Sequence, residues 1–125
     1  MRPFVRNKLF FQNQLDPSAA AFLSATGITD PTITAAINTL VLGLKANNLW
    51  TKFDRLFPMV GGTSTTTKYD LINTANTITW NNLVSGDFTA NGVKGDGSSK
   101  FGDLNYNPTT NGVNYTQNSS SLFMY

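Results

Sequence analysis

The chain has 125 residues, nine Lys and Arg against seven Asp, a net charge of +2, and no Glu, His or Cys. It therefore lacks the commonest general base and most ligands of zinc and transition metals, and paired carboxylates could be built only from Asp. We expect a non-enzymatic protein without a cofactor that binds, anchors or assembles. Because only 13% of residues are charged, about half the usual fraction, the net charge says little about partners.

Residues 1–15 are expected to form an N-terminal arm. Its basic residues interrupt the apolar ones, so the arm is not a signal-peptide core, and no apolar run approaches the ~18 residues of a membrane span. A solvated basic terminus is favoured over a nucleic-acid contact, so neither nucleic acid nor membrane is an expected partner. The arm residues predicted to contact neighbouring subunits are Leu9, Phe10 and Phe11.

Two Asp-Pro pairs predict helix starts. Asp16 and Asp30 can each act as an N-cap by accepting a free backbone N–H. The proline that follows each Asp has no backbone N–H, and at the first helical position such a group would have no hydrogen-bond partner in the helix. The first helix is predicted over residues 17–26, ending at Gly27, which suits the left-handed position after a helix. Its side chains expected to be buried are Ala21, Phe22 and Ala25.

The second helix is predicted over residues 31–46. Its apolar side chains recur at spacings of three and four and make one stripe: Ile33, Ile37, Leu40, Val41 and Leu44. A third, short helix is predicted over residues 49–57, closed by Pro58. The resulting helical region, residues 16–60, must bury its apolar faces, either as a cap on the following sheet or as a docking surface for another protein.

The chain from Gly61-Gly62 onward is typical of short strands. The predicted strands are residues 66–71, 77–80, 88–90, 93–95, 100–104 and 121–125. Asn91-Gly92 predicts a type I′ hairpin turn, and Asp96-Gly97 predicts a second turn of the same kind.

The last predicted strand, residues 121–125, is apolar. Such a strand needs neighbours or a cover, so Leu122 and Phe123 are predicted assembly contacts. The expected fold class is α+β: a three-helix region followed by a partial antiparallel β-sandwich, of jelly-roll or lectin-like type, in residues 61–125. We expect this sandwich to continue beyond the chain or to be completed by another chain.

Two further groups of residues suggest weaker binding sites. Asp87, Asp96 and Asp103 could hold Ca²⁺ together with loop carbonyls, but Asp beside Gly is also an ordinary turn residue, and we expect no metal. Trp80 and Tyr106 could stack on sugar rings, although aromatic residues in strands more often pack in a core or across strands.

Several stretches are distinctive together: Ala21-Phe22-Leu23, Gly27-Ile28-Thr29-Asp30-Pro31, residues 35–41, Leu49-Trp50 and residues 57–63. This pattern resembles a segment of bacteriophage and prophage virion proteins that precedes a concanavalin-A-like (laminin-G-like) β-sandwich. Residues 92–101 resemble the first hairpin of that sandwich, and Asn107-Pro108 with residues 120–125 resemble its next core strand. Only the opening strands are present, and the paired Glu of glycosidases with this fold is missing, so hydrolysis is not implied.

The resemblance implies a structural protein of the virion, made in the host cytoplasm. Its implied role is the particle-attachment region of a tail or head fibre that serves host attachment. The implied partners are other virion proteins and further copies of the chain. The alternative is a lectin-like module that binds host glycans through the sandwich, with exposed aromatic residues near Trp80 or Tyr106.

Overall fold

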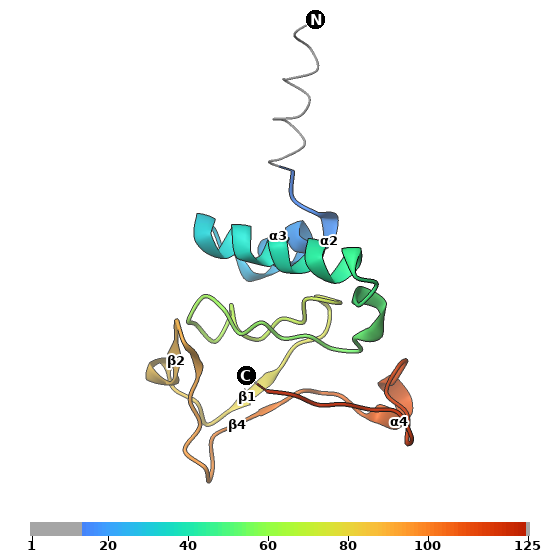
Figure 1. The fold of residues 1–125 in the computed structure, drawn as a ribbon. Coiled ribbons are helices and arrows are strands. Elements are labelled where there is room, and N and C mark those ends of the chain that lie inside the picture. The colour runs from blue at the N-terminus through green and yellow to red at the C-terminus, as the bar shows by residue number, and fades with distance from the viewer. Residues whose placement is uncertain (1–13, 125) are drawn as a thin grey trace, which may run out of the picture.

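The computed structural model of the protein describes residues 14–124 (Figure 1). In chain order the elements are α2 (Pro17–Thr26), α3 (Pro31–Ala46), the 3₁₀ turn η1 (Trp50–Lys52), β1 (Thr79–Asn81), the 3₁₀ turn η2 (Ser85–Asp87), β2 (Phe88–Thr89), β3 (Gly92–Val93), β4 (Phe101–Asp103) and α4 (Pro108–Asn111). The α+β class is confirmed. None of the described helices is long and apolar enough to cross a membrane. The predicted contacts Leu9, Phe10 and Phe11 lie outside the described residues.

Helices α2 and α3 begin and end where the local signals predict. The Asp16 carboxylate accepts the backbone N–H of Ser18 at 2.9 Å, and the Asp30 carboxylate accepts that of Thr32 at 2.8 Å. Gly27 adopts a left-handed φ of 71° after α2. Both helix predictions are confirmed, because caps and proline act within one turn of the chain.

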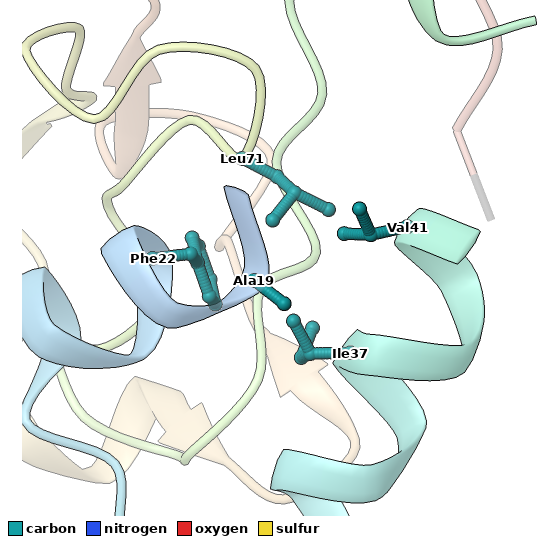
Figure 2. Close-up of a cluster of buried hydrophobic side chains, with 5 residues drawn as sticks. All are labelled: Ala19, Phe22, Ile37, Val41 and Leu71. Atoms are coloured by element: carbon teal, nitrogen blue, oxygen red, sulfur yellow. The ribbon is translucent and has the colours of Figure 1, made fainter. Parts of the chain in front are cut away.

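The core lies between the two helices and a middle segment, residues 53–78. Figure 1 shows the helices as one layer, the middle segment beneath them, and the strands beyond it. The buried cluster comprises Ala19, Phe22, Ile37, Val41 and Leu71 (Figure 2). Since Leu71 comes from the middle segment, the helices cap an irregular layer of chain.

The predicted buried face of α2 is wrong in part. Ala21 is exposed and Ala25 is half-buried, whereas Ala19, Leu23 and Thr26 are buried together with Phe22. These four positions also form a stripe with helical spacing, and α3 and Leu71 pack on that stripe. In α3, the predicted stripe holds for Ile37 and Val41, while Leu40 is exposed.

The predicted third helix over residues 49–57 is wrong. Only the single turn η1 forms, and Phe53 is extended, with φ −89° and ψ 129°. Asp54 and Leu56 explain this departure, because the Asp54 carboxylate and the Leu56 N–H both bind partners farther along the chain. A third α-helix does occur in the described chain, but it is the four-residue α4.

The strands form two separate antiparallel ribbons. β1 pairs with β4, with Trp80 opposite Gly102, and β2 pairs with β3, with Phe88 opposite Val93. The predicted strand 66–71 contributes only an isolated bridge from Tyr69 to Thr77, and residues 121–124 form no strand. No sandwich packing is present in residues 14–124, and the sandwich stays a prediction.

The predicted turn types are wrong. A type I′ turn needs positive φ at both central residues, yet Gly92 has φ 120° and Asn91 is not left-handed. Likewise Gly97 has φ 72° while Asp96 does not adopt positive φ. At the second turn the Asp96 carboxylate organises the loop by accepting three backbone N–H groups, from Ser98, Ser99 and Lys100.

Candidate functional site

The Asp54 carboxylate ties the C-terminal part of the described chain to the turn after η1. It accepts the Tyr106 hydroxyl at 2.8 Å and the backbone N–H groups of Val113, Asn114 and Tyr115 at 2.9, 2.7 and 3.1 Å. The Asn114 side-chain amide adds a fifth hydrogen bond at 2.9 Å. We call these five residues the Asp54 clasp. Because both oxygens are used, the clasp fixes the position of the loop that follows α4.

The clasp keeps its two titratable groups in fixed protonation states. Burial by itself would raise the pKa of Asp54, but hydrogen bonds from the Asn114 N–H, the Tyr106 hydroxyl and the other two N–H groups hold it well below its usual range. Burial and the bond to Asp54 raise the pKa of Tyr106 to about 12. At neutral pH the carboxylate is therefore ionised and the phenol protonated, which suits a structural contact and not proton transfer.

A second carboxylate, that of Asp70, is fully buried and contacts the two residues that follow Asp54. Asp70 accepts the backbone N–H groups of Leu56 and Ile72 at 3.0 and 2.9 Å and the Asn76 amide at 3.1 Å. The Arg55 Nε lies 3.9 Å from the Asp70 carboxylate and has no hydrogen-bond partner in the described chain. Asp70 thus holds together three stretches of the middle segment, which has no regular secondary structure to do so.

Beyond the clasp, the chain presents an apolar stretch to solvent. The residues from 120 to 124, which we call the apolar segment, include Leu122, Phe123 and Met124, whose exposed fractions are 81%, 69% and 92%. Figure 1 shows the chain after α4 running back as an extended trace toward β1. These predicted assembly residues therefore lie on the surface.

The apolar segment is held in place by contacts on its N-terminal side and at Phe123. On its N-terminal side Thr116 and Ser119 form a tight antiparallel bridge, with backbone hydrogen bonds of 3.0 and 3.2 Å. Within it, the Phe123 ring meets the Phe53 ring edge-on, at 6.4 Å between centroids. Since Phe53 precedes Asp54, the clasp and this aromatic pair position the segment together.

The three carboxylates proposed for Ca²⁺ are engaged separately. Asp87 pairs with Lys100 at 2.9 Å, Asp96 caps its own turn, and Asp103 accepts the backbone N–H of Asn105 at 2.8 Å. Residues 14–124 contain no group of three or more carboxylates that could hold a metal ion. The structure does not bring these three side chains together.

The two aromatic residues proposed for sugar stacking are both half-buried. The Trp80 ring packs edge-on against Phe88 at 5.5 Å, and its Nε1 donates to the Ser64 carbonyl at 3.2 Å. Tyr106 belongs to the clasp and packs edge-on against Tyr115 at 6.3 Å. The two rings are therefore used within the protein and are not shown to share a groove.

Sequence reasoning missed the clasp and the Asp70 cluster. One signal was available, because charged residues are scarce in this sequence. An Asp beside a large apolar residue, as in Phe53-Asp54 and Asp70-Leu71, indicates a carboxylate that is buried with hydrogen-bond partners. The partners of these carboxylates carry no local signal, because they are backbone N–H groups and amides of remote loops.

No protein-family model, characterised protein or solved structure matches the chain. The resemblance to virion proteins therefore stays a prediction, and the function has to be argued from the surface and the charges.

Proposed function

We propose that the chain is a non-enzymatic structural protein of a bacteriophage virion, the particle-attachment region of a tail or head fibre. In this proposal residues 61–125 contribute the opening strands of a jelly-roll or lectin-like sandwich that neighbouring protein completes. The observation that carries the proposal is the exposure of Leu122, Phe123 and Met124 on a segment that the contact between Phe123 and Phe53 holds in place. Burial of each such side chain on a partner stabilises an assembly by up to about 1.5–3 kcal/mol.

Further apolar side chains are exposed elsewhere on the described surface. On α3 and the residues after it, these are Leu40, Leu42 and Leu49; on and around the ribbons they are Val84, Phe101, Leu104 and Val113. Single exposed apolar residues are ordinary, but this number on so small a chain favours a protein that is covered by neighbours.

The carboxylates support a structural role. All seven Asp of the chain lie in residues 14–124, and each accepts at least one backbone N–H: Asp16, Asp30, Asp54, Asp70, Asp87, Asp96 and Asp103. With no Glu present, a pair of catalytic carboxylates would have to be taken from Asp residues that already cap helices, turns and loops. The chain therefore uses its acidic groups to cap helices and to hold irregular backbone in place.

The test is the composition of purified particles. Phage particles from a culture that expresses the chain are banded by density-gradient centrifugation and digested for mass spectrometry. We expect peptides of the chain to co-band with the major capsid protein, while an abundant host enzyme, the control, stays at the top of the gradient. Absence of the chain from the particle band would overturn the proposal.

A further inference from the structure

The backbone of the apolar segment is free to pair. Among the described residues, the N–H and C=O groups from 120 to 124 make no hydrogen bond, whereas the Thr116–Ser119 bridge immediately before them is paired. An extended stretch with unpaired backbone groups is what a strand of another chain can join.

The segment also lacks the devices that protect exposed edges. Natural edges carry Lys, Pro, Gly or a bulge that prevents pairing with another chain. Residues 113–125 contain no Gly or Pro, and residues 104–125 contain no charged side chain. Low charge, no Pro and few Gly are part of the pattern of segments that pair readily with copies of themselves.

We propose that the apolar segment of one chain pairs as a β-strand with the apolar segment of a second copy. This inference rests on the proposed assembly role and names the partner in it. A second copy fits because like-charge repulsion, which opposes pairing of most identical strands, is absent throughout residues 104–125. A charged strand of a different protein would find no side chain of opposite charge in residues 104–125 to pair with its own charges.

The side chains alternate in the way this pairing needs. In an extended strand, neighbouring side chains point to opposite faces, so Leu122 and Met124 share one face and Phe123 lies on the other. Phe123, which packs on Phe53, is the least exposed of the three. Leu122 and Met124 therefore face outward, where a paired copy would place the same two side chains alongside them.

The first test compares a charge inside the segment with a charge outside it. Leu122→Lys puts a charge in the segment, at a side chain that is 81% exposed, and Ala90→Lys puts one at an exposed side chain in the turn between β2 and β3. By light scattering across a concentration series, we expect the wild-type chain and Ala90→Lys to associate and Leu122→Lys to associate about tenfold or more weakly. Circular dichroism confirms that each variant is folded.

A second test identifies the partner as the same segment. Leu122→Lys and Leu122→Asp are each expected to remain monomeric and to associate when mixed, because opposite charges then meet across the strands. Equal weakening by Ala90→Lys, or no recovery on mixing, would overturn the pairing, as would a monomeric wild-type chain at every concentration. A monomer that is nevertheless found in particles would refute this inference and leave the proposed function standing. Self-association of a chain that is absent from particles would support this inference and overturn the proposed function.

Discussion

The hydroxyl of Tyr106 donates a 2.8 Å hydrogen bond to the carboxylate of Asp54, 52 positions earlier in the chain. This contact joins the end of the β1–β4 ribbon to the turn after η1. The same carboxylate receives three backbone N–H groups from residues 113–115. One ionised side chain thus does for this irregular region what regular secondary structure does elsewhere.

Loss of the charge at Asp54 should loosen the C-terminal part of the chain. We expect Asp54→Asn to lower the free energy of unfolding by roughly 2–4 kcal/mol, because hydrogen bonds to an ionised group are the strong ones and several backbone donors would lose theirs. Urea unfolding measures the loss, and amide hydrogen exchange should become faster in residues 113–124. Asp103→Asn, where one exposed carboxylate accepts the Asn105 N–H, is the control and should change stability by less than about 1 kcal/mol. Similar losses in the two variants would contradict a special role for the clasp.

In the acid range, stability should depend on pH through the Asp side chains. The pKa values of Asp16, Asp54, Asp87 and Asp96 are lowered in the folded protein, so the unfolded chain binds more protons in the acid range. Their contribution is present above the ordinary Asp pKa of about 3.9 and is lost as pH falls below it toward the folded values. With no Glu, His or Cys side chain to titrate, the free energy of unfolding measured by urea should be nearly constant from about pH 5 to pH 7. A steep change within that interval would show that another group controls stability.

Gly102 should tolerate no side chain. A Cβ added there would lie 2.5 Å from Cζ3 of Trp80 and 2.8 Å from Cγ2 of Ile78, both parts of packed side chains. We expect Gly102→Ala to destabilise the protein by about 1–3 kcal/mol through overpacking. Gly86→Ala, where a Cβ meets nothing within 4 Å, is the matched control and should leave thermal stability unchanged or slightly raised. If the two variants melt at the same temperature, the β1–β4 ribbon does not pack as described.

Gly43 in α3 should be replaceable with a gain in stability. It lies inside the helix, and a Cβ there meets nothing within 4 Å, so Gly43→Ala should stabilise the chain by about 0.5–1 kcal/mol. The same change at Gly27 should destabilise it by about 1 kcal/mol, because φ at that position is 71°. Thermal unfolding of the two variants should therefore shift in opposite directions, and a shift in the same direction would contradict the helix boundaries.

The helix boundaries could be predicted because their causes are local. Asp16, Asp30 and Gly27 act on backbone groups within a few residues, and the apolar spacing of α3 shows which face is buried. The composition likewise reveals, without any structure, that a pair of catalytic carboxylates in this chain would have to come from Asp.

Tertiary contacts decided the rest. Whether the chain after Trp50 stays helical depends on hydrogen bonds that Asp54 accepts from residues about 60 positions away, which no local pattern encodes. The buried face of α2 depends on Leu71, and the three proposed Ca²⁺ ligands are instead engaged by Lys100 and by nearby backbone donors. Caps and spacing act through neighbouring residues and can be read along the chain, whereas the partner of a carboxylate is whichever donor the folded chain brings within reach.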